Sequence, residues 1–93
     1  MFNVYNFHDG KVKSLVHESS TEKFTVGLMA EGTYLFFITT DEEMTVIHGF
    51  LQVLLPDSNH WQTFIAGTHF LLPKNSTVEI RSVGVTAYLC RYL

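Results

Sequence analysis

The chain is built from short apolar or alternating runs separated by clusters of turn-forming residues, and helical periodicity is hard to find in it. Hydrophobic side chains at every second position, or unbroken apolar runs of a few residues, are typical of β-strands. The pattern predicts strands at residues 11–17, 23–30, 33–39, 43–48, 50–55, 61–65, 69–72, 77–83 and 86–92. Eight or nine short strands in 93 residues predict an all-β sandwich or barrel.

The breaks between these strands fall at residues that favour turns. Glu31-Gly32 predicts a tight hairpin, residues 56–59 and 73–76 predict polar turns that begin with proline, and Ala66-Gly67 predicts a kink. No repeat, linker or change of composition divides the chain, and its length suits one domain. We therefore expect a single domain over residues 1–93.

The last predicted strand is apolar on both of its faces. One face carries Tyr88, Cys90 and Tyr92, and the other carries Ala87, Leu89 and Arg91. A strand of this kind is covered on both sides, whereas one face of a small barrel normally meets water. The second cover is either another layer of sheet or a partner subunit, and a homodimer is the simplest explanation.

Composition narrows the choice of partner and compartment. The net charge is −3 and the six lysines and arginines are scattered, so a nucleic-acid polymer is a poor partner. We find no basic leader and no apolar run of membrane-spanning length. The single cysteine, Cys90, lies in an apolar run and predicts a reduced, buried thiol. Together these features predict a cytoplasmic protein that contacts no membrane.

Two spacings match the paired motifs of cupins, which are small jelly-roll proteins. Glu42 and Gly49 are separated by six residues, and Gly67 and Pro73 are separated by five. Glycine and proline at these places suit the turns and strand ends of a jelly roll. The fold expected is therefore a single cupin-like jelly-roll β-barrel.

The ligands of a metal-binding cupin are missing from the sequence. Residues 34–40 contain no histidine where a His-x-His pair would stand, and Val78 takes the place of the later histidine. The five histidines include no pair at a spacing of two or four residues. Three or four nitrogen or oxygen ligands are needed for a catalytic metal. We expect no metal and no other cofactor.

Two polar features of the predicted strands could carry chemistry. Arg91 needs an anionic partner if it is covered, and that partner is either a protein carboxylate or a phosphate. Of the consecutive residues Glu42 and Glu43, only one can point into a barrel. An inward carboxylate could bind sugar hydroxyls or stabilise a positively charged transition state, while an outward one would simply be solvated.

Five segments of the sequence together resemble one family. They are GKVKS at 10–14, VGLMAEGTYLF at 26–36, EEMTVIHG at 42–49, LQVLLPD at 51–57 and YLCRYL at 88–93. These segments are similar to those of the pyrimidine/purine nucleoside phosphorylases, a family of short, metal-free, cupin-like proteins. The resemblance implies a homodimer that cleaves purine and pyrimidine nucleosides with orthophosphate. Its implied substrates are uridine, adenosine, guanosine, inosine, cytidine, thymidine and xanthosine, and its products are the free base and α-D-ribose 1-phosphate.

This implied chemistry suggests roles for residues in the matching segments. Arg91 is the first candidate for binding phosphate, with Lys13 and Thr45 as weaker ones, and Glu43 is preferred to Glu42 as the catalytic carboxylate beside the ribose. The residues proposed to stack on the base are Tyr34, Phe36 and Tyr88. Stacking alone would admit purines and pyrimidines alike, because every base has a π-face.

A second function is compatible with the same fold. Cupin scaffolds host many activities, so the chain could instead be a non-catalytic dimer that binds a small molecule. Such a binder would hold its ligand without any dependence on phosphate. The aromatic residues would then be ordinary core residues or the walls of a binding pocket.

Overall fold

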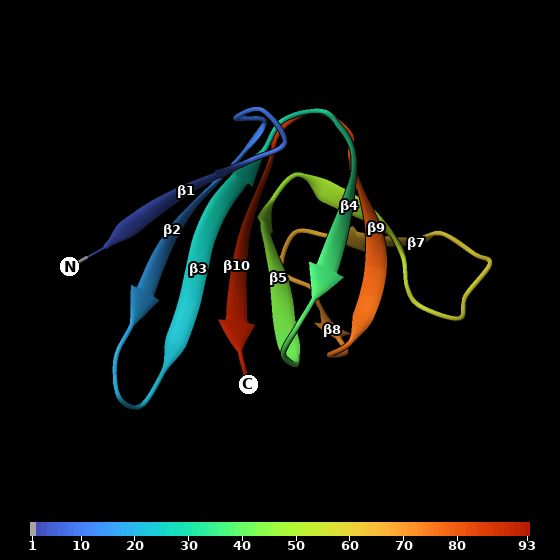
Figure 1. Ribbon diagram of the computed structural model, residues 1–93. Coiled ribbons are helices and arrows are strands. Elements are labelled where there is room, and N and C mark those ends of the chain that lie inside the picture. The colour runs from blue at the N-terminus through green and yellow to red at the C-terminus, as the bar shows by residue number, and fades with distance from the viewer. Residues whose placement is uncertain (1) are drawn as a thin grey trace.

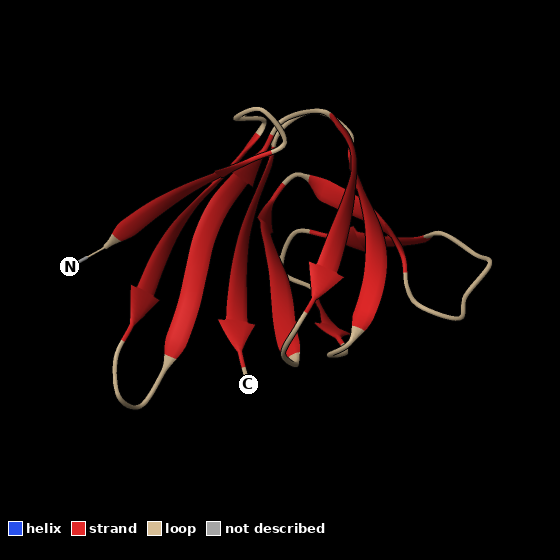
Figure 2. Cartoon of the chain, viewed as in Figure 1, coloured by secondary structure: helices blue, strands red, loops and turns tan. Residues whose placement is uncertain are grey.

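Two antiparallel β-sheets face each other in the computed structural model, which describes residues 2–93 (Figure 1). The larger sheet has the order β1 (Asn3–Phe7), β2 (Val12–Glu18), β3 (Lys23–Met29), β10 (Thr86–Tyr92), β5 (Glu42–His48), β8 (His69–Leu72). The smaller sheet has the order β4 (Gly32–Ile38), β9 (Ser76–Ser82), β6 (Phe50–Leu54), β7 (Gln62–Ile65). The described residues form strands and loops without any helix (Figure 2). They therefore include no helix long and apolar enough to cross a membrane.

The all-β prediction is confirmed, and each of the nine predicted strands is present within two residues of its expected ends. Strand β1, whose five residues are all exposed, was not predicted. Strand β1 has no buried face to produce an apolar alternation, and it pairs along one edge with β2. Its turn to β2 runs through His8, Asp9 and Gly10, all with positive φ.

The hairpin predicted at Glu31-Gly32 is wrong. Strands β3 and β4 lie in different sheets, so this segment carries the chain across from the larger sheet to the smaller one. The corner is held by Tyr34, whose side chain points inward and whose hydroxyl donates a hydrogen bond to the Ala30 carbonyl oxygen at 2.8 Å. This hydrogen bond fixes the connection between the two sheets, where a hairpin would have formed a ladder of backbone hydrogen bonds.

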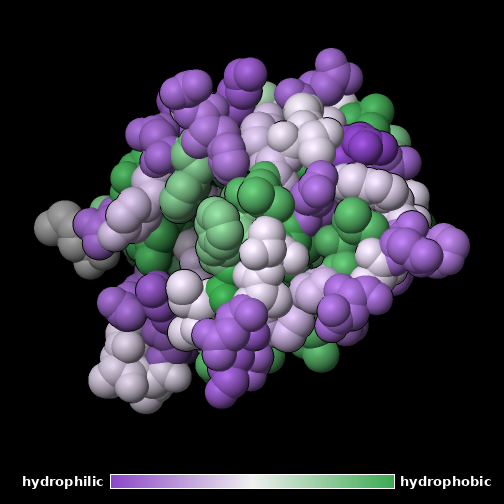
Figure 3. Space-filling model, turned by 45° about the vertical axis from the view of Figure 1, so that its right-hand side comes forward, coloured by the Kyte–Doolittle hydropathy of each residue, from purple (hydrophilic) through white to green (hydrophobic). Residues whose placement is uncertain are grey.

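Strict alternation places every second side chain in the space between the sheets. On β10 the buried positions are Thr86, Tyr88 and Cys90, and on β5 they are Met44 and Val46. The other positions form the outer faces. Their exposed apolar side chains lie on both sheets, and Figure 3 shows hydrophobic residues gathered in the middle of one face with hydrophilic residues around them.

Close packing in the larger sheet depends on a glycine. Gly27 on β3 lies opposite Tyr88 on β10, and a Cβ at Gly27 would come within 2.5 Å of the Tyr88 ring and 2.7 Å of the Lys13 carbonyl oxygen. The missing side chain gives the Tyr88 ring its place against the sheet. From there its hydroxyl reaches across β3 to the Ser14 hydroxyl on β2, at 2.5 Å. The sequence of β3 thus positions a polar pair inside the barrel.

Candidate functional site

The inner surface of the larger sheet forms an interior cleft made of two adjoining cavities. Strands β1, β2 and β3 extend to one side of the smaller sheet (Figure 1), and their inner face lines a cavity of about 400 Å³. A second cavity of about 160 Å³ lies between the sheets. Both are lined by Phe7, Ser14, Thr25 and Tyr92, so they adjoin. Ligand sites typically have several hundred Å³, which the wider cavity offers.

A carboxyl group and a thiol meet at the inner end of this cleft. The Cys90 Sγ donates a hydrogen bond to the Glu42 Oε1, at 3.0 Å. Burial raises the pKa of Glu42, and the Cys90 hydrogen bond and the Lys23 charge oppose that rise. Burial, together with the nearby Glu42, raises the pKa of the Cys90 thiol far above its ordinary value. The thiol therefore stays protonated and serves as a hydrogen-bond donor rather than a nucleophile.

Phenol and alcohol hydroxyls line the same inner surface. Tyr88 bonds to Ser14, and its pKa is raised mainly by burial. Burial raises the pKa of Tyr92 to about 12, and the negative charge of the nearby Glu42 adds to the rise. Thr25 adds a buried alcohol between them. At neutral pH all four groups keep their protons; one proton is used in the bond between Tyr88 and Ser14, and the others can be donated to the oxygens of a sugar or an anion.

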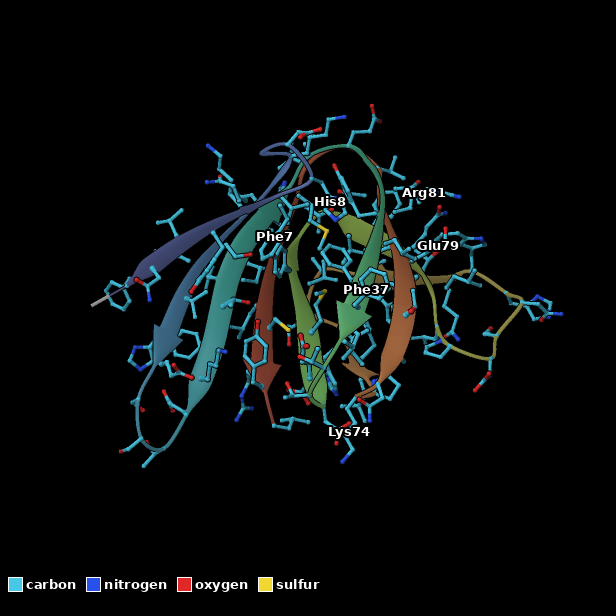
Figure 4. All side chains as sticks on the ribbon, viewed as in Figure 1. Phe7, His8, Phe37, Lys74, Glu79 and Arg81 are labelled. Carbon is cyan, nitrogen blue, oxygen red and sulfur yellow. The ribbon has the colours of Figure 1, made fainter. Side chains whose placement is uncertain are left out.

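On the smaller sheet, Phe36 lines the narrower cavity of the cleft, and two further rings lie beside it. His8 lies against Tyr34 and Phe36 from β4, with ring centroids 4.9 and 5.4 Å apart. Figure 4 shows His8 and Phe7 at the turn between β1 and β2, close to β4, with Phe37 further along that strand. Of these three rings, Phe36 is the one that faces the cavity, and it offers a surface on which another ring can stack.

Three of the sequence-predicted site residues lie inside the barrel. Tyr34 and Tyr88 are buried, and Phe36 and Tyr88 line the cleft directly. Tyr34 lies beside Phe36, with ring centroids 6.4 Å apart. Their position is compatible with the predicted stacking role, although Tyr88 belongs to the polar surface and Phe36 to the aromatic wall.

The other four predicted residues lie on the outer face of the larger sheet. They are Lys13, Glu43, Thr45 and Arg91. In the single chain the Arg91 side chain is 63% exposed. Its guanidinium NH1 lies 3.8 Å from the Glu43 Oε1, so its anionic neighbour is a protein carboxylate.

The preference for Glu43 as the inward carboxylate is corrected by the strand register. Arg91 pairs with Glu43 and Tyr92 pairs with Glu42. Paired residues share a face, and neighbouring residues face opposite ways. Because Tyr88 and Cys90 point inward, Glu42 lies with them, and Glu43 lies outside with Arg91.

Several cleft residues were not found from the sequence. Inward positions of their strands are occupied by Ser14, Thr25, Tyr92 and Lys23. The signal that could have found Ser14 was its place between Val12 and Val16, both on the inner face of β2. A polar residue at an inward position of a strand needs a partner inside. His8 left no such signal, because it lies in a turn.

Within residues 2–93, no three histidine, cysteine, aspartate or glutamate side chains gather as they would around a metal ion. The stretch 34–40 supplies Tyr34, Phe36 and Ile38 to the barrel interior. Glu42 is the acidic side chain of the narrower cavity, and its neighbour is a thiol hydrogen.

Comparison with known proteins identifies the family. A family model described as pyrimidine/purine nucleoside phosphorylase matches residues 2–92. The chain belongs to this family. A relative of that name from Serratia proteamaculans is 48% identical over 94 residues, which covers 100% of this chain and 98% of the relative. Another of the same name, from Shigella dysenteriae, is 46% identical and is covered completely. The resemblance predicted from the five segments is confirmed.

Solved structures agree on the fold. A protein of unknown function from Vibrio parahaemolyticus superposes with a TM-score of 0.96 at 34% sequence identity. The superposition covers 100% of this chain and 99% of the Vibrio chain. A cupin superfamily protein from Desulfitobacterium hafniense superposes with a TM-score of 0.75 at 13% identity, covering 96% of this chain and 83% of its own. The pyrimidine/purine nucleoside phosphorylase fold seen here is thus a cupin-like jelly roll, as predicted.

Tyr92 allows a test of the cleft in solution. Its pKa rises from 10 to about 12 on folding, so the folded state holds the phenol proton more tightly than the unfolded state does. The stability due to the protonated phenol is fully present below pH 10 and is lost as the pH rises toward 12. We expect the free energy of unfolding, measured with urea, to fall less between pH 10 and 12 in Tyr92→Phe than in the unchanged protein. Identical pH dependence would contradict the burial described here.

Proposed function

We propose that this chain is a broad-specificity nucleoside phosphorylase that works in the interior cleft. The observation that carries the proposal is a cleft with a carboxyl group, hydroxyl donors and an aromatic wall, in a chain 48% identical to a protein named as such an enzyme. The reaction would be a pentosyl transfer from a nitrogen base to orthophosphate. It makes the protein a glycosyltransferase of the pentosyltransferase type, with phosphate as a co-substrate.

The chemistry requires charge stabilisation at the anomeric carbon. An oxygen of hydrogen phosphate bonds to C1′ while the bond between C1′ and the base nitrogen breaks. The electron pair of that bond stays on the base, the phosphate proton ends on the base, and ribose 1-phosphate remains. The sugar becomes oxocarbenium-like between the two states. A carboxylate beside the ribose stabilises this charge and accepts hydrogen bonds from the sugar hydroxyls.

Glu42 is the carboxylate that the structure favours for this role. It lines the narrower cavity, its Oε1 is held by Cys90, and the hydroxyls of Tyr88 and Tyr92 line the same cavity. Cys90 is a positioning residue in this proposal, because it acts on the reaction through Glu42. Glu43 lies on the outer face beside Arg91 and does not reach the cleft of its own chain.

The two sheets divide the recognition of the substrate. The larger sheet supplies the polar side chains of the narrower cavity, whereas the smaller sheet supplies the inward apolar side chains of Phe36, Ile38 and Ile80. A base placed on the apolar wall would be held by its ring face, and its polar edge would not be read. This supports acceptance of purines and pyrimidines alike, from uridine and cytidine to adenosine and xanthosine.

We also propose that the protein is a homodimer that pairs through the outer face of the larger sheet. Exposed hydrophobic side chains line that face, at Val4, Leu15, Val26, Leu28, Ile47 and Leu71. Lys13 and Arg91 lie among them with Glu43. In a twofold interface each patch meets its own copy, so the cations of one chain can face the carboxylate of the other. A second copy would also cover Arg91.

The function is tested by product analysis with purified protein from a host that lacks its own nucleoside phosphorylases. We expect uridine to yield uracil and adenosine to yield adenine, each with ribose 1-phosphate, when phosphate is present. Without phosphate, we expect no release. Absence of release from both nucleosides would favour the alternative, a non-catalytic cupin dimer that binds a small molecule, and retention of nucleoside by dialysis would then be measured.

Glu42→Gln and Glu43→Gln form a matched pair on neighbouring positions of β5. We expect Glu42→Gln to lower kcat/KM about 100-fold or more, because the charge that stabilises the transition state is lost. Glu43→Gln should change kcat/KM by less than about threefold. Because burial raises the pKa of Glu42, the acid limb of wild-type kcat/KM should lie above the ordinary carboxyl value of 4.5. A larger loss in Glu43→Gln would reverse the assignment.

The dimer is tested by light scattering after size-exclusion chromatography. We expect the unchanged protein to have the mass of two chains and Leu28→Asp to have the mass of one, because the charge would be buried in the proposed interface. Leu35→Asp is the matched control, since Leu35 is similarly exposed on the outer face of the smaller sheet. A monomeric wild type, or a Leu28→Asp dimer, would exclude this interface.

A further inference from the structure

Lys23 stands at the mouth of the interior cleft. It begins β3, points to the inner face of the larger sheet, and lines the wider cavity. Its Nζ lies 4.6 Å from the centre of the Tyr92 ring and 3.9 Å from the Glu18 Oε2. Among the described residues that line the two cavities of the cleft, it is the one lysine or arginine. The cations predicted for phosphate, Arg91 and Lys13, lie on the other side of the sheet.

Strand register places Lys23 in one row with the candidate catalytic carboxylate. Lys23 pairs with Tyr92 across β3 and β10, and Tyr92 pairs with Glu42 across β10 and β5. Two inter-strand steps of about 4.8 Å separate Lys23 from Glu42 along this row. The cation is close enough to lower the pKa of Glu42, yet the Tyr92 ring stands between them. A row of this kind has a positive end at the mouth and a negative end at the inner wall.

The surroundings of Lys23 suit an oxyanion. Ser14, Thr25 and Tyr92 add hydroxyl groups to the wider cavity, and Asn3 adds an amide. Phosphate oxygens are bound in proteins by cations together with such neutral donors. The opposing charge is Glu18, whose side chain is 68% exposed. An exposed ion pair at 3.9 Å contributes little, so an incoming dianion can replace it.

We propose that Lys23 is the group that binds orthophosphate, and the phosphate of ribose 1-phosphate, at the mouth of the cleft. This inference rests on the proposed function and names the phosphate subsite within it. Phosphate bound at Lys23 and a carboxylate at Glu42 lie at opposite ends of one row. A ribose held between them would have the attacking phosphate oxygen on one side and the charge-stabilising carboxylate of Glu42 on the other. Lys23 binds a substrate here and transfers no proton.

The kinetic test compares Lys23→Met with Lys13→Met. Lys13 is the matched control because it is an exposed cation on the adjacent strand that faces the opposite side of the sheet. We expect Lys23→Met to raise the KM for phosphate at least tenfold at saturating uridine, with the KM for uridine changed less than threefold. Lys13→Met should change neither, and Lys23→Arg should recover most of the phosphate affinity. A phosphate KM that is unchanged in Lys23→Met would overturn the assignment.

A binding measurement keeps the inference separate from turnover. Inorganic phosphate is titrated into each protein, and the backbone amide signals of β3 and β10 are followed by NMR. We expect saturable shifts around residue 23 in the wild type and in Lys13→Met, and at least tenfold weaker binding in Lys23→Met. If Lys23→Met does not fold, as judged by its amide spectrum, Lys23→Gln takes its place.

The two measurements distinguish the inference from the proposed function. If the wild type binds phosphate at Lys23 but releases no base, the anion site is supported and the phosphorylase function is refuted. If Lys23→Met releases base as efficiently as the wild type, and only with phosphate, the phosphorylase function is supported and the anion site at Lys23 is refuted. Shifts that are identical in Lys23→Met and the wild type would also refute the site.

Discussion

The side chains of β10 point alternately to the two sides of the larger sheet, and this alternation determines where each polar residue of the protein can act. Strand β10 is hydrogen-bonded to β3 on one edge and to β5 on the other. Its register with these strands aligns residues from distant parts of the sequence into rows. Tyr92 lies in one row with Lys23 and Glu42, and Cys90 lies in the next inward-facing row with Thr25. A shift of β10 by one residue would turn Tyr92 and Cys90 to the outer face of the sheet and Arg91 to the inner face.

The fold could be predicted from the sequence because its signals are local. Alternation, turn residues and two glycine spacings were sufficient for the strands and the jelly roll. The interior polar residues were harder to predict, because β10 is apolar on both faces and its pattern does not say which face is inside. Arg91 and Cys90 were therefore equally eligible for the interior. Only pairing with strands distant in the sequence separates them, and it places Glu42 inside and Glu43 outside.

The errors at the start of the chain have a different origin. Strand β1 is an edge strand without a buried face, so its residues show no apolar stripe. The segment Glu31-Gly32 has the composition of a tight turn, but the inward side chain of Tyr34 bonds to Ala30 and carries the chain to the other sheet. Both cases show tertiary contacts deciding what local composition left open.

Strand β1 contributes to the wall of the cleft but not to the hydrophobic core of the barrel. Asn3, Tyr5 and Phe7 line the wider cavity, yet no described residue of β1 belongs to the buried hydrophobic core. Sequence changes in these residues can therefore reshape one wall of the cavity at little cost to the packing between the sheets. The shape of the cavity and the thermal stability can consequently vary independently among related chains, with the residues of β1 free to diverge while the core residues are retained.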